Sequence, residues 1–410
     1  MMAMARRKTV LTVWCVLACL IGSFLFLIFQ GGKLASMLFA VMLILSAYLT
    51  MGRWSGITKA QGKRSISGIG SDGLVPAGTP VSVQIQAEIP GFWPIPYVMV
   101  KDRLVRRGGG EMTFDASFVP DWRRRGTLEY TTPPMRRGFY YFGSTRCTTE
   151  DIFGLFEHSG VLEMPGSFGV LPQTVPIREW RQYRQMMKGM HQHSASTRAM
   201  RETTQINGVR EYHYGDRLSR IHWNATAKTG EFKSKEFERE SLPKSILVLD
   251  RNRKSYGDEE QFELAVSIAA SLLEFASRRD IALGLLSVGK EATYFDPTRS
   301  AMQYRLMLNH LVDVEADGAH SLLHVLKNHA RAFAPGSFFA LITPQWSEPM
   351  RQVLDWLESV DMNPCHFWLP QTTAKAQEEG WMNELRKRGF AGYAIHALGE
   401  LPRALGGRVS

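Results

Sequence analysis

Cysteine is scarce in this chain, and its four cysteines form no recognisable framework. Cys15 and Cys19 lie in an apolar run, whereas Cys147 and Cys365 are far apart and have no CxxC spacing. This pattern excludes a disulfide scaffold and gives no sign of a zinc site. Isolated thiols of this kind are typical of buried side chains in a reducing compartment.

Several catalytic and nucleic-acid-binding motifs are missing as well. Neither the GxSxG nucleophile elbow nor the GxxxxGK[ST] phosphate loop occurs, and these motifs are the usual sequence evidence for α/β-hydrolases and P-loop NTPases. There is no internal repeat, low-complexity tract, RNP-like aromatic pattern or helix-turn-helix pattern. We therefore expect a protein that is not an enzyme and does not bind nucleic acid.

The charge is unbalanced towards positive, because 49 Lys and Arg residues face 39 Asp and Glu residues and give a net charge of +10. A hydrophobic content of 44% with 21% charged residues allows buried cores, and 410 residues suggest two globular units plus extra segments. A basic balance can indicate nucleic acid, but in a membrane protein it more often indicates Lys and Arg facing acidic lipid.

Two long uncharged runs near the N-terminus predict a transmembrane hairpin over residues 1–52. Residues 10–29 and 34–51 are almost entirely apolar, and QGGK separates them. A helix of about 20 apolar residues crosses a bilayer, and backbone groups in lipid must be bonded internally. The second run and the lack of a small-x-small cleavage site argue against a signal peptide.

The basic residues beside the two runs predict the orientation of the hairpin in the cell membrane. The turn holds only Lys33, while the outer ends are rich in Lys and Arg. The outer residues are Arg6, Arg7, Lys8, Arg53, Lys59, Lys63 and Arg64. Because basic residues favour the cytoplasmic side, we expect both termini and the soluble domains in the cytoplasm.

Four further segments follow the hairpin. Residues 53–78 are rich in Gly, Ser and Lys and predict a linker. Residues 79–175 contain short alternating strands broken by Gly, Pro and Asp, which predict a small β-sandwich. Residues 176–244 predict a polar connecting segment. Residues 245–400 alternate buried strands with helical patterns, which predict a mostly parallel sheet covered on both faces.

One stretch concentrates charged and aromatic side chains: GVREYHYGDRLSRIHWNATAKTG, residues 208–230, the signature stretch. Asp216 is placed to cap a helix beginning near Arg217, and Gly230 is suited to end it. Asp216 and His222 are the only candidate acid/base pair, with no Ser or Cys in a nucleophile setting nearby. The pattern favours a structural lock or a partner-docking surface, while an active site stays open as an alternative.

The signature stretch closely resembles that of the domain-of-unknown-function 58 family, which has Arg-Glu-Tyr, a Gly-Asp turn, Arg-x-Ile-x-Trp and Ala-x-x-Gly in this order. The matching residues are Arg210, Glu211, Tyr212, Gly215, Asp216, Arg220, Ile221, Trp223, Ala227 and Gly230. DIFGLF, residues 151–156, resembles a second phrase of the family, which usually has a Pro at the position of Ile152. The likeness covers nearly the whole chain.

The resemblance implies a fold that is α/β plus all-β: an N-terminal two-helix transmembrane hairpin, a small β-sandwich and a C-terminal von Willebrand factor A-like doubly wound sheet. Members of the family are bacterial membrane proteins typically encoded beside MoxR-type AAA+ ATPases and often beside transglutaminase-like membrane proteins. No enzymatic reaction is established for the family. The resemblance therefore implies an interaction or assembly role.

The resemblance also raises the question of a metal, because some A domains carry a metal-ion-dependent adhesion site with Asp-x-Ser-x-Ser after the first strand. Here LVLDRNRKS keeps Asp250, but Asn252 and Lys254 replace the two serines and Ser255 comes one place late. A lysine ammonium repels a divalent cation, which requires oxygen ligands. We expect no metal and no cofactor; if a metal binds, Asp250, Asn252 and Ser255 would hold it.

Two later positions complete such a site in an A domain, a Thr near the start of a helix and an Asp after a central strand. This chain has His320 or Ser321 at the first position and Pro344 or Gln345 at the second. Arg251, Arg253 and Lys254 are instead expected to form a basic rim at the C-terminal edge of the sheet. Ligands usually bind α/β folds at this edge, so we expect an acidic protein surface as the partner.

The function expected from these patterns is that of a membrane-anchored cytoplasmic scaffold or adaptor. It would dock a MoxR-type AAA+ ATPase and a transglutaminase-like membrane protein in envelope-linked protein assembly or maturation. The first alternative is a hydrolytic enzyme with a site around Asp216 and His222. The second is nucleic-acid binding through the β domain, where DWRRRG and PMRRG place arginines beside aromatic residues.

Overall fold

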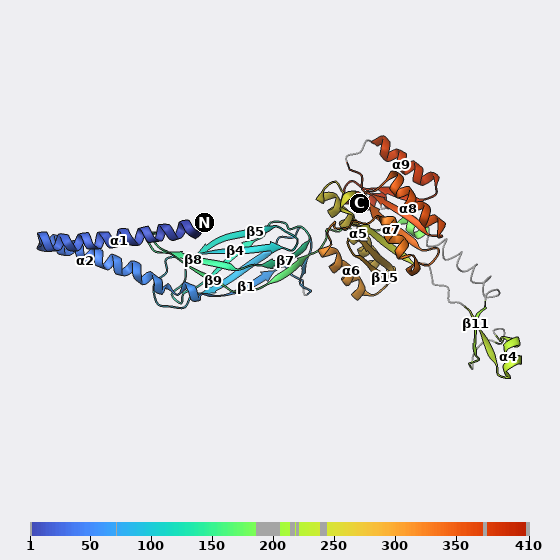
Figure 1. Cartoon of the computed structure of the whole chain (residues 1–410), viewed down its shortest axis with the longest axis horizontal. Helices are drawn as coiled ribbons and strands as arrows, with labels where there is room; N and C mark the ends of the chain where they lie inside the picture. The colour runs from blue at the N-terminus through green and yellow to red at the C-terminus, as the bar shows by residue number, and fades with distance from the viewer. Residues whose placement is uncertain are drawn as a thin grey trace. The chain divides into compact units, whose positions relative to one another are not determined.

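The computed structural model describes residues 2–70, 72–185, 206–213, 218, 221–237, 244–371 and 375–406. The chain divides into two compact units, Met1–Leu171 and Pro172–Ser410, whose elements are labelled in Figure 1. The first unit holds the N-terminal helices and an all-β part, which we call the β unit. The second holds the α/β unit and the signature stretch.

The chain begins with two apolar helices that are long enough to cross a membrane, α1 (Met2–Gln30) and α2 (Gly32–Met51). They lie antiparallel beside each other (Figure 1), and the rings of Phe24 and Phe39 are 5.5 Å apart. Gly31 joins them with a φ of +60°, a left-handed conformation that glycine adopts without steric cost. The predicted pair of long apolar helices is thus confirmed.

The β unit consists of two antiparallel sheets that enclose one hydrophobic core. The three-stranded sheet has the order β1 (Gln61–Ser67), β3 (Ser82–Glu88), β6 (Arg125–Thr131). The second sheet has the order β2 (Leu74–Val75), β10 (Ser167–Val170), β7 (Gly138–Phe142), β4 (Val98–Arg106), β8 (Thr145–Glu150), β9 (Glu157–Leu162). Strand β5 (Glu111–Phe118) pairs with β4. The short strand β2 is the exception to the antiparallel arrangement, because it pairs parallel with β10. Along β3, β4, β6 and β8 more buried residues alternate with more exposed ones, as the period of two requires.

The predicted linker over residues 53–78 is wrong in part, because residues 61–67 form strand β1. This strand turns Gly62, Arg64 and Ile66 inward. Of these three inward residues, only Ile66 is large and apolar. The sequence of β1 therefore lacks the alternation of apolar and polar residues by which a strand is recognised. Arg64 is therefore a core residue of the β unit, and it does not count among the basic residues that would face a membrane surface.

The α/β unit is a six-stranded sheet in which β15 (Ala292–Thr298) runs antiparallel at one edge and the other strands are parallel. Its helices cover both faces, as predicted. The remaining strands, in sheet order, are β14 (Leu283–Val288), β13 (Ser245–Asp250), β16 (Phe338–Thr343), β17 (Asn363–Trp368) and β18 (Ala391–Ala394). One face carries α5 (Glu259–Arg278), α6 (Ala301–Asp313) and α10 (Leu401–Ala404); the other carries α7 (Leu322–Asn328), α8 (Ser347–Ser359) and α9 (Lys375–Lys387).

The α/β unit begins earlier than its predicted boundary at residue 245. Residues 172–185, most of them expected to belong to a polar connector, contribute Ile177, Trp180 and Tyr183 to the core of the α5 face. Trp180 is 2% exposed, and its indole N–H donates to the hydroxyl oxygen of Tyr393 at 3.2 Å. The connecting segment as predicted is therefore wrong at this end.

Candidate functional site

The described residues of the signature stretch, with the residues on either side of it, form a small ribbon with a short helix. Strands β11 (Ile206–Glu211) and β12 (Lys233–Phe237) pair antiparallel, and α4 (Trp223–Thr229) lies in the connection between them (Figure 1). Ile221 bridges to Ser234 of β12 and is 2% exposed. The rings of Tyr212 and Phe232 are 5.9 Å apart. Hydrogen bonds and one buried side chain thus hold this module together.

The helix of the signature stretch starts later than predicted. It begins at Trp223, where His222 is the N-cap and its Nδ1 accepts the amide hydrogen of Ala225 at 3.1 Å. Because Nδ1 accepts, a neutral His222 carries its proton on Nε2. The predicted end is confirmed, since Gly230 has a φ of +76° and donates to the carbonyl of Thr226. Leu218 precedes the helix, although a helix beginning near Arg217 would have included it.

Of the predicted acid/base pair, only His222 is among the residues that the structure describes. Gly215, Asp216 and Arg220 lie outside the described residues, so their assigned roles stay predictions. His222 serves as a helix cap, a structural task that any good acceptor can perform. The described part of the stretch therefore gives no support to the hydrolytic alternative.

The charges of the signature stretch pair locally. The Arg210 guanidinium donates to the main-chain oxygen of Glu211 at 3.0 Å and contacts Nδ1 of His213 at 3.1 Å. The Glu211 carboxylate lies 3.5 Å from Nζ of Lys233. Exposed pairs of this kind contribute little to stability.

Large apolar side chains of the signature stretch are exposed. Trp223 is 62% and Leu218 71% exposed, and Val209 and Phe232 are also exposed. Exposed aromatic and aliphatic side chains in a short module are typical of interaction surfaces. We call these four residues the signature face.

A second candidate lies at the C-terminal end of strand β13, where Asp250 is fully buried. Its Oδ1 accepts from the amide of Asn252 at 2.9 Å, and its Oδ2 accepts from the hydroxyl of Thr343 at 2.8 Å and from Nε2 of Gln345 at 2.9 Å. Burial raises the pKa of the Asp250 carboxyl, and these hydrogen bonds oppose that rise. Protein donors thus satisfy the carboxylate on both oxygens.

The amide of Gln345 lies where a cation would have to bind. Its Nε2 donates to Asp250 and, at 2.8 Å, to the hydroxyl oxygen of Ser255, so it joins two of the oxygens expected to hold a metal. Asn252 directs its side-chain oxygen to the amide of Lys254 at 3.0 Å. Donor groups on these oxygens do not fit a divalent cation. Among the described residues, no cluster of His, Cys, Asp or Glu is placed to hold a metal.

The structure removes Arg251 from the predicted basic rim. Arg251 is 8% exposed, and its guanidinium donates to the carbonyl of Glu315 at 2.9 Å and to the carboxylate of Asp317 at 2.7 Å. Burial lowers its pKa, and the two acidic neighbours oppose the change. Arg253 and Lys254 are exposed, so the rim retains two of its three predicted cations.

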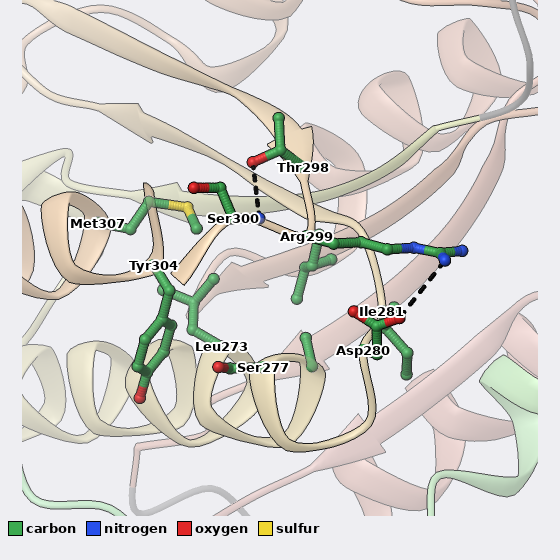
Figure 2. Close-up of a pocket in the computed structure, with 11 residues that line it drawn as sticks. Leu273, Ser277, Asp280, Ile281, Thr298, Arg299, Ser300, Tyr304 and Met307 are labelled. Carbon is green, nitrogen blue, oxygen red and sulfur yellow. Dashed lines mark hydrogen bonds and ion pairs between the residues drawn. The ribbon is translucent and has the colours of Figure 1, made fainter. Parts of the chain in front are cut away.

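A small cavity between α5 and α6 is too small for an organic ligand. It has room for about 20 Å³, enough for one water molecule. Figure 2 shows the guanidinium of Arg299 turned to the carboxylate of Asp280 and the amide of Ser300 bonded to the hydroxyl of Thr298. The polar groups at its mouth are thus paired with one another, and we assign no site to it.

Magnesium should not stabilise this protein, because the Gln345 amide already satisfies Asp250 and Ser255. We expect the Tm of the α/β unit to be the same with EDTA and with MgCl2. Replacing the amide by a second carboxylate in Gln345→Asp brings two like charges together in a buried place. This variant should lose about 1–3 kcal/mol and regain most of it when MgCl2 is added.

The control is Gln345→Ala, which removes the same two hydrogen bonds without adding a charge. It should be destabilised equally with and without MgCl2. Stabilisation of the wild-type chain by Mg²⁺ in differential scanning fluorimetry would contradict the assignment of the amide to the place of the cation.

Comparison with known proteins gives one curated relative. The uncharacterized protein YeaD of Bacillus subtilis (strain 168) is 27% identical over 250 residues, which cover 58% of this chain and 59% of that protein. The chain therefore matches less than two thirds of the length of this relative.

Solved structures show only weak likeness. Proximal thread matrix protein 1 from the mussel byssus has a TM-score of 0.30 and 13% identity, covering 41% of this chain and 46% of that chain. The CARDB domain of the PF1109 protein from Pyrococcus furiosus has a TM-score of 0.18 and 13% identity, covering 27% and 87%. Scores this low say nothing about the fold. The family comparison is more specific: residues 208–352, which hold the signature stretch and strands β13 to β16, match the family described as "Protein of unknown function DUF58".

Proposed function

We propose that this chain is a bacterial, membrane-anchored cytoplasmic scaffold that docks protein partners rather than an enzyme. The observation that carries the proposal is the signature face. The most recognisable part of the sequence exposes Trp223 on α4, and Phe232 just before β12 is also exposed, whereas a catalytic signature would gather polar groups around a cleft. The partner of the proposal is a MoxR-type AAA+ ATPase.

Two features of the other elements support the same proposal. The apolar helices α1 and α2 would hold the chain in the membrane, with Arg53, Lys59 and Lys63 favouring a cytoplasmic position for the soluble units. The parallel sheet with one antiparallel edge strand and helices on both faces supports a von Willebrand factor A-like identity of the α/β unit. Such a unit would offer Arg253 and Lys254 to an acidic surface of the partner.

The nucleic-acid alternative receives no comparable support from the described residues. Arg124, the central arginine of DWRRRG, donates to the main-chain oxygens of Ile89, Trp93 and Ser55. Arg103 pairs with the carboxylate of Glu111. These arginines are engaged within the β unit, and we propose no nucleic-acid function.

Partner capture from native membranes tests the scaffold proposal. The full-length chain should retain the ATPase in the presence of ATP, identified by mass spectrometry. The variant Trp223→Ser should weaken this association by about 30-fold, the effect of losing roughly 2 kcal/mol at an interface hot spot. The matched control is Met302→Ser, which removes an equally exposed apolar side chain from α6, since Met302 is 66% exposed.

Two results would contradict the proposal. The first is wild-type protein that retains no ATPase from intact membranes treated with a cross-linker. The second is Trp223→Ser protein that retains the ATPase as well as Met302→Ser does, because the signature face would then play no part in docking.

A further inference from the structure

The exposed apolar side chains of the β unit gather at one of its ends. Of the ten large apolar residues between 52 and 171 that are strongly exposed, seven lie in the loops of this end and three (Met99, Tyr141 and Val161) lie within strands. The seven, which we call the apolar collar, are Trp54, Phe92, Val119, Trp122, Ile152, Phe153 and Leu155. Loops at the opposite end, such as residues 107–110 and 132–137, expose none among the described residues.

Hydrogen bonds join the loops of the collar to one another. Arg124 donates to the carbonyl of Ile89 at 2.8 Å and also to the carbonyls of Trp93 and Ser55, so three separate chain segments meet at one guanidinium. In the fourth segment, Asp151 accepts from the amides of Phe153 and Phe156 at 2.8 and 2.6 Å. This turn leaves Ile152 71% and Phe153 59% exposed. The collar is therefore an ordered surface.

The collar adjoins the last turn of α2. The ring of Tyr48 in that turn lies 5.7 Å from Trp93 and 6.2 Å from Phe153, and its hydroxyl accepts from the amide of Ile152 at 3.5 Å. Tyr48 is three residues before the end of α2, which is where a spanning helix leaves the hydrocarbon. Loops in contact with this residue lie at the level of the headgroups, on whichever side of the membrane α2 ends.

We propose that the apolar collar enters the interfacial layer of the bilayer that α1 and α2 cross, so that the β unit is seated on the membrane surface. The composition fits this layer, because Trp, Tyr and Phe with neighbouring cations are characteristic of membrane interfaces. The Arg123 guanidinium lies 4.5 Å from the centre of the Trp122 ring, and Arg123 is exposed, so a cation accompanies the aromatic side chain. The inference rests on the membrane anchoring in the proposed function.

The depth of fluorescent labels in lipid tests the inference on the full-length chain. Cys15 and Cys19 are replaced by alanine, while Cys147 and Cys365 are buried and do not label in the folded protein. Single cysteines at Ile152 and at Val119 then carry an NBD label in two different loops of the collar. The control is Asp72→Cys, an exposed position in the turn before β2, at the other end of the β unit.

The purified variants are reconstituted in nanodiscs of phosphatidylcholine and phosphatidylglycerol, with and without a lipid that carries a nitroxide near the headgroup. We expect strong quenching of the labels at 152 and 119 and none of the label at 72. Because these nanodiscs contain no other membrane protein, quenching of a label reports its contact with lipid.

Two negative results are distinguishable. Labels at 152 and 119 that behave like the label at 72, in a chain that resists carbonate extraction from membranes, would overturn the collar and leave the anchoring intact. A chain that carbonate extracts would overturn the anchoring and the collar together.

Discussion

Replacing Arg64 by methionine should destabilise the β unit by about 3–5 kcal/mol, the cost of leaving one charge of a buried pair without its partner. The Arg64 guanidinium lies 2.6 Å from the Asp102 carboxylate, and the two side chains are 3% and 1% exposed. Arg64 also donates to Thr145, and the hydroxyl of Tyr130 donates to Asp102 at 2.5 Å. The loss of the guanidinium leaves the buried carboxylate of Asp102 with neutral donors and without its countercharge.

Burial lowers the pKa of Arg64, and the charge of Asp102 opposes that change. Burial, with the hydrogen bond to Asp102, also raises the pKa of Tyr130.

Hydrogen exchange on the full-length protein measures this effect within one unit. In Arg64→Met, amides of β1, β4 and β8 should exchange much faster, whereas those of the α/β unit should not change. Lys63→Met is the matched control, because Lys63 is the exposed neighbour on the same strand. The double variant Arg64→Met/Asp102→Leu should recover most of the loss, since no unpaired charge remains. Normal protection in Arg64→Met would refute the buried pair as a stabilising element.

Replacing Trp180 by alanine should cost the α/β unit about 3–5 kcal/mol, the usual loss when a buried tryptophan leaves a cavity. Its ring centroid lies 5.5 Å from those of Phe338 and Phe367, and 5.1 Å from that of Tyr183. Two of these neighbours belong to β16 and β17. Trp180 thus attaches the segment before residue 186 to the centre of the sheet, together with Ile177 and Tyr183.

Urea unfolding followed by hydrogen exchange in β16 and β17 checks this prediction. Gln182→Ala is the control, because Gln182 is exposed two residues further along the same segment. Trp180→Phe should fall between, since it keeps a ring but loses the hydrogen bond to Tyr393. Equal stability of Trp180→Ala and Gln182→Ala would show that the segment is not part of the folded core.

The α/β fold could be predicted because its strands and helices carry strong local patterns. Strands β13, β14 and β16 are buried at every position, and their sequences are continuous apolar runs between turns. The start of α5 also carries a local signal, because Asp258 directly precedes the helix and its carboxylate accepts from the amide of Gln261. These features depend on residues within a few positions of one another.

The predictions from sequence were wrong where contacts between residues far apart in the chain decide which side chains are buried. Arg64 was counted as a surface cation because nothing near it in sequence reveals Asp102, which is 38 positions away. Arg251 was placed on a basic rim for the same reason, since Asp317 is 66 positions away. Ile177, Trp180 and Tyr183 recur every three residues, a signal that was available, but charged neighbours concealed it.

The candidate sites also have a part that the local sequence indicates and a part that only the folded chain brings together. The replacement of the serines after Asp250 argued against a cation there, whereas the role of Gln345 depends on β13 and β16 lying side by side. The exposed aromatic residues of the collar come from four separate loops, so only the folded β unit brings them together.

The Gln345 amide has a consequence for how any docking at this edge would be controlled. A surface completed by a metal can be assembled or dissolved by the supply of that metal, and chelators release whatever it holds. An amide is permanently present at fixed stoichiometry. The edge of this sheet is therefore always in its finished form, and a partner that binds there must be released by a change in itself, such as its own nucleotide cycle.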